Sequence, residues 1–156
     1  LLAREEDVYA SDNSTNVNQV IAEEVELLQE FAELQGNRID WIEGADAHCA
    51  AKPRVLGIIM SNLIRNALTY TQNGTVTICV EREFVAVRDT GIGMSDDEMD
   101  KIFTAFYRSE AAKSSGHGQG LGLALVRRLV QQLGWTVEVS SQQQVGTEFK
   151  VWFDAP

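Results

Sequence analysis

The chain has 156 residues, 44% of them hydrophobic, and its 13 basic and 23 acidic residues give a formal net charge of −10. Length and composition are typical of one globular domain. The charge argues against nucleic acid as a partner, because such binding rests on Lys and Arg at the phosphates. An anionic ligand must therefore be held by local geometry and a cation.

Two cysteines, Cys49 and Cys79, are too few and too far apart for a zinc set or a disulfide framework. Cys79 lies in an alternating apolar run, so we expect it to be a small core residue. Neither a signal peptide nor a membrane-length apolar run is present. The chain does not start with Met, and we expect it to be part of a longer protein whose soluble part lies in a reducing compartment.

The elements follow in chain order from the hydrophobic pattern. Residues 1–7 indicate the end of a helix, and the polar stretch 11–16 is expected to be a linker ending in helix N-cap residues. Helical spacing predicts three main helices, at 17–34, 53–68 and about 121–133. Alternating segments predict five strands, at 38–42, 75–81, 84–88, 135–140 and 147–153. This pattern predicts an α/β fold, a mixed five-stranded sheet with three main helices on one face.

Four short motifs occur in a fixed order between residues 62 and 123. They read N-x-x-x-N-A at Asn62–Ala67, D-x-G-x-G at Asp89–Gly93, F-x-x-F-Y-R at Phe103–Arg108 and G-x-G-x-G-L-G-L at Gly116–Leu123. Any one of them alone is a weak signal. Together they predict a site, assembled from distant pieces, that binds ATP and hands its γ-phosphate onward.

Asn62 and Asn66 are four residues apart in a predicted helix, so both lie on one face. A carboxamide oxygen that faces phosphate can ligate Mg²⁺, a hard cation that prefers oxygen. The alternative is that both amides are solvated residues of the helix surface.

Asp89 ends a strand and enters a loop with Gly91 and Gly93. A short carboxylate at the base of a pocket can accept a hydrogen bond from the exocyclic amine of adenine, whereas guanine presents a carbonyl there. The glycines would let the backbone approach the ring. The alternative is an ordinary turn.

The glycine-rich segment 116–122 leads into the third helix, where free amides and the helix dipole suit a polyphosphate. Its pattern excludes P-loop and Rossmann interpretations, and a mere hinge fits poorly with Leu121 and Leu123 among the glycines. Residues 109–119 are expected to form a mobile loop. Arg108 is a candidate phosphate contact and Lys113 a weaker one, with a plain surface arginine as the alternative for Arg108. Phe103 and Phe106 are expected to pack as core or hinge anchors.

This ordered set resembles the catalytic, ATP-binding domain of bacterial sensor histidine kinases, within the GHKL group, over residues 16–153. Segment 62–71 is similar to the asparagine box, 89–94 to the first glycine box, 102–108 to the phenylalanine box and 118–123 to the second glycine box. Residues 146–149 match the closing strand of the family.

The resemblance implies a two-layer α/β sandwich with residues 109–119 as an ATP lid. It implies that residues 1–15 end a preceding dimerisation and phosphotransfer domain and that residues 16–156 form the catalytic domain. Asn66 would ligate Mg²⁺, supported by Asn62, and Arg108 would complete the catalytic set. The remaining nucleotide contacts implied are Tyr70, Asp89, Gly91, Gly93, Lys113, Gly118, Gly120, Leu121, Gly122, Leu123 and Thr147.

The resemblance also implies the partners. These are a histidine-bearing helical domain of the same protein and a response regulator downstream. The fragment is expected to be monomeric and the full-length protein to be a homodimer, with this domain on the cytoplasmic side of an inner-membrane sensor. The fragment is expected not to phosphorylate itself, because His48 lies in a predicted polar loop and His117 in the glycine box.

Two departures from the family pattern bear on activity. Many relatives carry a basic residue where this chain has Thr69 and an arginine where it has Ala105. A nucleotide-binding module with weak or no kinase activity therefore stays open, as does a serine kinase of the anti-sigma type. ATPases of the group instead use a glutamate at the position of Asn62, and because Asn62 is a poor base, the sequence favours a kinase over a hydrolase.

Overall fold

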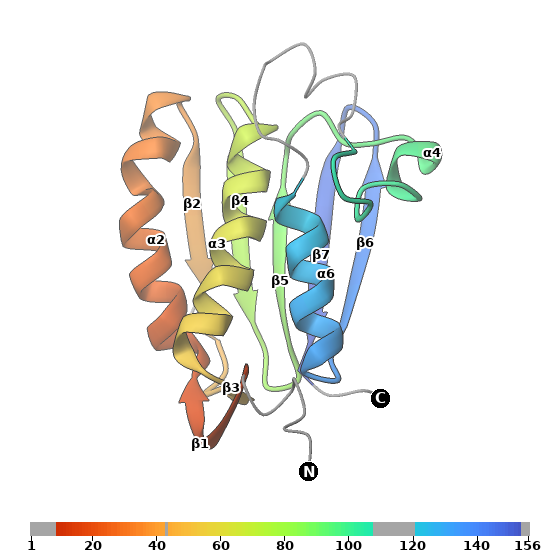
Figure 1. The fold of residues 1–156 in the computed structure, drawn as a ribbon. Helices are drawn as coiled ribbons and strands as arrows, with labels where there is room; N and C mark the ends of the chain where they lie inside the picture. The colour runs from red at the N-terminus through yellow and green to blue at the C-terminus, as the bar shows by residue number, and fades with distance from the viewer. Residues whose placement is uncertain (1–8, 43, 108–120, 154–156) are drawn as a thin grey trace.

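The computed structural model describes residues 9–42, 44–107 and 121–153. A mixed five-stranded sheet forms one layer, and helices α2, α3 and α6 cover one of its faces (Figure 1). The strand order is β2-β4-β5-β7-β6, in which β2 and β4 are parallel and the other neighbours are antiparallel. The predicted two-layer α/β sandwich is confirmed.

The bounds of the elements agree closely with the expected ones. The sheet consists of β2 (Arg38–Ile42), β4 (Thr75–Val80), β5 (Phe84–Asp89), β6 (Thr136–Gln142) and β7 (Gly146–Trp152). The helices are α2 (Val17–Leu34), α3 (Pro53–Thr69), the short α4 (Asp96–Met99) and α6 (Gly122–Gln132). A separate two-stranded ribbon pairs β1 (Ala10–Asn16) with β3 (His48–Ala51).

The core lies between the sheet and α3, which is flanked by α2 and α6 (Figure 1). β4 alternates buried and half-buried residues, so one face of the strand packs on the helices and the other faces outward. Removal of these apolar side chains from water is the main stabilising contribution. The fully buried side chains of α3 are Leu56, Ile59, Met60, Leu63, Ile64 and Leu68.

The sequence signals for helix ends are confirmed at α2 and α4. Asn16 caps α2, since its side chain accepts a hydrogen bond from the Gln19 amide at 3.1 Å. Gly36 follows the helix with φ of +70°, the left-handed conformation that ends helices. Ser95 and Glu98 form a capping box at the start of α4, which ends at Met99.

Three expectations were wrong. Residues 11–16 belong to strand β1 rather than to a linker, and Thr15 Oγ1 donates to the Ala51 carbonyl at 2.6 Å. His48 begins strand β3 instead of lying in a loop. Main-chain pairing holds the polar β1 and the short β3 together, and such pairing leaves no long apolar alternation in the sequence. Cys79 is half-buried on the outer face of β4, because Val76, Ile78 and Val80 occupy the alternate, inner positions.

The strand register aligns several chain ends at one edge of the sheet. Arg38 pairs with Thr75, Val76 with Asp89, and Asp89 with Thr147. The turn after α2, the loop after α3 and the start of α6 lie toward the same end, at the top of Figure 1. The ribbon of β1 and β3 lies at the opposite end.

Within the described ranges, none of the helices combines the length and apolar character that crossing a membrane requires.

Candidate functional site

Asp89 is the buried charged residue of this edge, with 5% of its surface exposed. Its Oδ1 accepts hydrogen bonds from the Gly91 amide at 2.8 Å and from the Thr147 amide at 3.3 Å. Both donors use one oxygen, so Oδ2 is left to accept from another group. A carboxylate fixed by two main-chain donors cannot rotate freely, and the direction of its second oxygen is therefore set by the fold.

Burial raises the pKa of Asp89 to about 6, although the hydrogen bonds from Gly91 and Thr147 favour the charged form. Burial is the larger effect because desolvation penalises the carboxylate more than two amide donors stabilise it. Asp89 is thus ionised at neutral pH but close to its titration range. Such a perturbed, buried carboxyl at the end of a strand is a candidate for ligand recognition.

Close contact between main chains forms the walls around this carboxyl. A β-carbon placed on Gly91 would lie 2.2 Å from the Tyr70 carbonyl oxygen, and one on Gly146 would lie 2.0 Å from the Asp89 carbonyl oxygen. Both distances are far below van der Waals contact, so only glycine fits. Gly93, with φ of +69°, likewise lies against the main chain of Gln142 in the β6–β7 turn.

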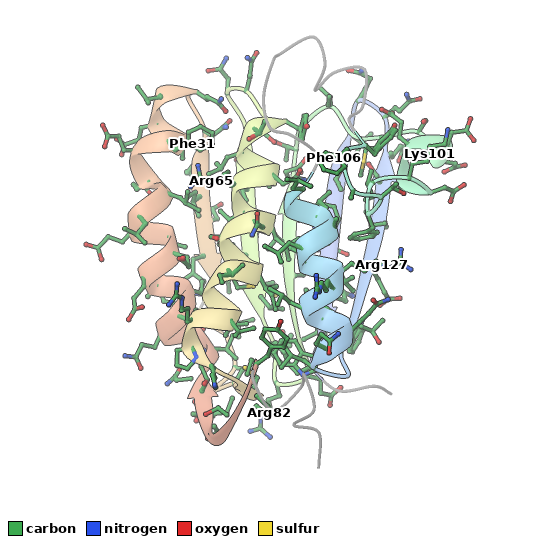
Figure 2. The ribbon with its side chains drawn as sticks, viewed as in Figure 1. Phe31, Arg65, Arg82, Lys101, Phe106 and Arg127 are labelled. Atoms are coloured by element: carbon green, nitrogen blue, oxygen red, sulfur yellow. The ribbon has the colours of Figure 1, made fainter. Side chains whose placement is uncertain are left out.

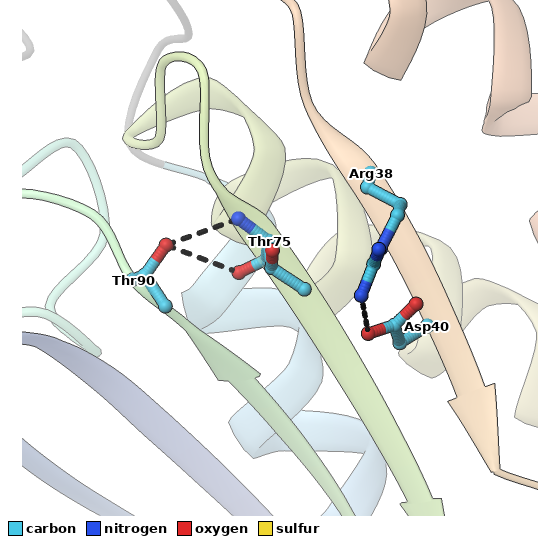
Figure 3. Close-up of polar contacts among 4 residues, drawn as sticks. All are labelled: Arg38, Asp40, Thr75 and Thr90. Carbon is cyan, nitrogen blue, oxygen red and sulfur yellow. Dashed lines mark hydrogen bonds and ion pairs between the residues drawn. The ribbon is translucent and has the colours of Figure 1, made fainter.

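Hydroxyl groups tie the neighbouring strand ends together. Thr90 Oγ1 accepts from the Thr75 amide at 3.0 Å and lies 3.5 Å from the Thr75 carbonyl oxygen, which joins β4 to the end of β5 (Figure 3). Ser141 Oγ accepts from the Met94 amide at 2.8 Å and lies 2.7 Å from Thr147 Oγ1. These bonds hold the loop after Asp89 against β4 on one side and β6 on the other.

Figure 3 also shows an ion pair between Arg38 and Asp40, whose charged groups are 2.7 Å apart. This pair is exposed on β2 and takes no part in the hydrogen bonds around Asp89. Exposed pairs of this kind contribute little to stability.

The first asparagine of the box in α3, Asn62, lies beside the start of α6. Asn62 Nδ2 donates to the Ile58 carbonyl at 2.7 Å, and Asn62 Oδ1 would lie 2.7 Å from a β-carbon on Gly122. The asparagine box and the second glycine box therefore meet, as the sequence predicts. Asn66 lies one turn further along α3 and is half-buried. No hydrogen bond joins its side chain to another described residue.

Tyr70 follows α3 and is half-buried. Its carbonyl accepts from the Ile92 amide at 3.2 Å, which holds the loop after α3 against the D-x-G-x-G loop. Leu123 packs on the core, whereas Leu121 precedes α6 and is exposed.

The phenylalanine box divides between core and surface. Phe103 packs edge-on against Phe149, with ring centroids 6.1 Å apart, and the Arg127 guanidinium lies 5.6 Å from the Phe103 centroid. The expectation of packing is confirmed for Phe103. It is wrong for Phe106, which is 72% exposed and has φ of +67°, a left-handed conformation that is uncommon for residues with a side chain.

Several expected contacts lie outside the described residues. These are Arg108, Lys113, Gly118 and Gly120, together with His117 and the expected lid at 109–119. Their roles stay predictions.

Two residues that shape this edge of the sheet were not predicted from the sequence. Ser141 makes hydrogen bonds that hold the loop after Asp89. Asn37, which is buried directly before β2, donates a hydrogen bond to the loop after α3. Neither belongs to one of the four motifs. The signal for Asn37 was a polar residue directly after a helix-ending glycine, which is common in surface turns.

Residues 51–156 match the family described as histidine kinase-, DNA gyrase B-, and HSP90-like ATPase. The chain belongs to this family. The resemblance to the catalytic, ATP-binding domain of sensor histidine kinases is confirmed by relatives and by solved structures alike.

Among curated relatives, the signal transduction histidine-protein kinase BarA of Escherichia coli (strain K12) is 36% identical over 111 residues, which are 65% of this chain and 12% of BarA. The aerobic respiration control sensor protein ArcB of the same organism is 38% identical over 105 residues, 63% of this chain and 14% of ArcB. The chain thus spans roughly an eighth of the length of these relatives.

Among solved structures, full-length ShkA in complex with AMPPNP superposes with a TM-score of 0.74 at 26% identity, covering 92% of this chain and 31% of ShkA. The catalytic domain of histidine kinase ThkA, in a nucleotide-free form, gives a TM-score of 0.75 at 21% identity and covers 91% of this chain and 94% of that domain. The likeness to ThkA supports the fold alone.

We predict that Asp89 titrates near pH 6 in the free domain and at lower pH with ADP bound, because a base amine stabilises the carboxylate. ADP affinity should fall about tenfold between pH 7 and pH 5, where about one carboxyl in ten is ionised. Carbon NMR of the carboxyl group and calorimetry at each pH measure both effects. Asp89→Asn assigns the signal and is the control for titration of the phosphates themselves.

The stability of the free domain depends on the titration of Asp89 in the opposite direction from ADP affinity. Because the folded state holds the Asp89 proton more tightly than the unfolded chain, the free domain gains stability below the ordinary aspartate pKa and loses it as pH rises through about 6. A carboxyl signal titrating near pH 4, with ADP affinity flat across this window, contradicts the assignment.

We predict that Gly122→Ala lowers the free energy of unfolding by about 1–3 kcal/mol, because its new methyl group meets Asn62 Oδ1. Gly57→Ala is the matched control: the nearest side-chain atom to its β-carbon would be Glu24 Oε1 at 3.8 Å, and better helix propensity should stabilise the domain by about 0.5–1 kcal/mol.

Asn62→Ala should relieve the clash, so the double variant Asn62→Ala/Gly122→Ala should be more stable than additivity predicts. Chemical denaturation of the parent, the two single variants and the double variant gives the coupling free energy between Asn62 and Gly122. Strict additivity would show that the two boxes do not touch.

Proposed function

We propose that this domain binds ATP with Mg²⁺ and transfers the γ-phosphate to a histidine on a helical domain outside the chain. The observation that carries the proposal is the buried Asp89 carboxylate, with one oxygen held by two main-chain amides and the other left for a ligand. Membership of the family and the meeting of the asparagine and glycine boxes at the same edge of the fold support it.

Base recognition follows from the chemistry of this carboxylate. Asp89 Oδ2 accepts from the exocyclic amine of adenine, and guanine would present a carbonyl oxygen to the same atom. An opposed pair of acceptors in a buried site costs the full desolvation of both groups. Tyr70, on the adjoining loop, packs against the base. The site therefore selects ATP over GTP.

The side-chain oxygens of Asn62 and Asn66 in α3 are ligands of the kind that Mg²⁺ prefers. Among the described residues there is no cluster of three or more His, Cys, Asp or Glu side chains to form a cage. Mg²⁺ needs none, since it is commonly held by one or two protein oxygens, phosphates and water. Asn66 would supply one such oxygen, and Asn62, with its amide committed to Ile58, turns its oxygen toward Gly122 at the start of α6. The bound ion neutralises charge on the phosphates.

The transfer itself needs positioning more than acid–base chemistry. A ring nitrogen of the acceptor histidine forms a bond to the γ-phosphorus, the bond to the bridging oxygen breaks, and ADP leaves. Asn62 stands where the hydrolases of the group carry a glutamate that activates water. Its amide cannot take a proton from water, so hydrolysis is disfavoured relative to transfer.

A module that binds nucleotide without transferring phosphate is the second candidate. Thr69 favours it, because its hydroxyl donates to the Arg65 carbonyl at 2.8 Å and offers phosphate no positive charge. The nearby Arg65 does not replace this charge, because its guanidinium lies over the Phe31 ring of α2, 5.7 Å from the ring centroid (Figure 2).

The wider context also belongs to the proposal. We place this domain on the cytoplasmic side of a membrane sensor that acts as a homodimer, with a response regulator as the final phosphate acceptor. The phosphotransfer domain would then end before strand β1, which pairs with β3 of this domain. The names of the relatives, which are sensor and signal transduction kinases, support this placement.

We predict that the isolated chain does not label itself with γ-phosphate, and that acid-labile label appears when the histidine-bearing domain of the same protein is supplied, attached or in trans. Asp89→Asn should abolish the transfer. A labelled helical domain identifies the kinase. Full nucleotide binding without label favours the second candidate, and label on the chain alone, lost in His48→Ala or His117→Ala, contradicts the proposal.

We predict that Asn66→Ala loses the magnesium-dependent part of ATP affinity, whereas Asp89→Asn loses base recognition and keeps the magnesium dependence. Calorimetry of each variant with Mg²⁺ and with a chelator separates the two roles. An Asn66→Ala variant with undiminished magnesium dependence removes Asn66 from the metal site.

A further inference from the structure

We propose that Asn37 is a positioning residue for the nucleotide, which holds the loop after α3 against the Asp89 loop. Asn37 is 6% exposed and begins the turn into β2, at the same sheet edge as Asp89. It belongs to none of the four motifs. The inference rests on the proposed function, since the ligand that it concerns is the adenine nucleotide.

The Asn37 side chain makes hydrogen bonds to three main-chain groups across the loop. Its Nδ2 donates to the Thr71 carbonyl at 2.8 Å and to the Leu68 carbonyl at 3.2 Å, and its Oδ1 accepts from the Gly74 amide at 3.0 Å. One carboxamide thus joins the end of α3 to the start of β4. A weaker contact, 3.5 Å to Gln35 Oε1, shares the same amide.

This loop is the part of the site that faces the base. It carries Tyr70, whose carbonyl accepts from the Ile92 amide at 3.2 Å and lies against Gly91. The Gly91 amide in turn donates to Asp89 Oδ1 at 2.8 Å. A continuous series of contacts therefore leads from the Asn37 side chain to the carboxylate.

The neighbouring Thr71 leaves the loop little freedom to adjust. Its hydroxyl oxygen is buried, has no partner among the described residues and would lie 2.7 Å from a β-carbon on Gly91. Loss of the Asn37 amide would leave the Thr71 carbonyl and the Gly74 amide unpaired at a buried position. The loop must then shift to find new partners, and Gly91 shifts with it.

The test compares two buried asparagines at opposite ends of the domain. Asn18, 7% exposed, donates from Nδ2 to the Ala45 carbonyl at 2.7 Å, near the ribbon of β1 and β3. Asn37→Ala and Asn18→Ala each remove one buried carboxamide from the same fold. Both should lower the melting temperature, so melting alone does not distinguish them.

The decisive readouts are taken well below both melting temperatures. ADP affinity by calorimetry should fall about tenfold in Asn37→Ala and less than twofold in Asn18→Ala. The preference for ATP over GTP should shrink several-fold only in Asn37→Ala. Amide hydrogen exchange at Gly91 and Thr147 should accelerate in that variant alone, because those two amides hold Asp89.

Asn37→Asp is a second variant in case Asn37→Ala does not fold. It keeps the acceptor for Gly74 but turns a carboxylate toward two carbonyl oxygens, so it should shift all three readouts in the same direction. Unchanged ADP affinity and Gly91 exchange in a folded Asn37 variant, or equal losses in Asn18→Ala, would overturn the proposal. If the parent domain fails to bind ADP, the proposed function fails, and hydrogen exchange at Gly91 still decides the role of Asn37.

Discussion

Direct contact between main chains is the constraint on which the site depends. The loop after α3, the loop after β5 and the β6–β7 turn approach one another so closely that no side chain fits between them at Gly91 or Gly146. The proximity brings the amides of Gly91 and Thr147 to a single carboxylate oxygen. Without it, Asp89 would be a buried charge with no donors, which is among the most costly arrangements in a protein.

The close approach also makes the site a property of the whole fold. Asp89 and Thr147 are neighbours only because β5 pairs with β7, and Tyr70 joins them only because α3 packs beneath the sheet. These contacts link residues far apart in the chain, and such non-local contacts form late because their loops must be closed first. The carboxylate geometry should therefore appear together with the last tertiary packing and not before it.

The sequence predicted the parts of this arrangement that a periodic pattern or a local motif encodes. Helices α2, α3 and α6 and the five strands follow from apolar spacing, and Asp89 follows from its motif. Phe103 also behaved as expected, because its place in the core follows from the hydrophobic pattern around it.

The rest depends on three-dimensional neighbours that no local pattern records. The β1–β3 ribbon is held by main-chain pairing between a polar segment and a strand of only four residues. Phe106 turns outward because of a backbone conformation that its residue type does not favour. Cys79 faces outward because the register of β4 gives the inner face to its neighbours, and Asn37 acts on a loop more than thirty residues away in sequence.

The raised pKa of Asp89 has a consequence for the energetics of ligand uptake. In the proposed complex, nucleotide and proton would compete for the same carboxyl group, so by reciprocity the nucleotide would act on the protein as an acid. Near pH 6 each binding event expels about half a proton into the medium, and the measured heat then includes the ionisation heat of whichever buffer receives it. In a poorly buffered compartment, a population of such domains filling with nucleotide would slightly acidify its own surroundings.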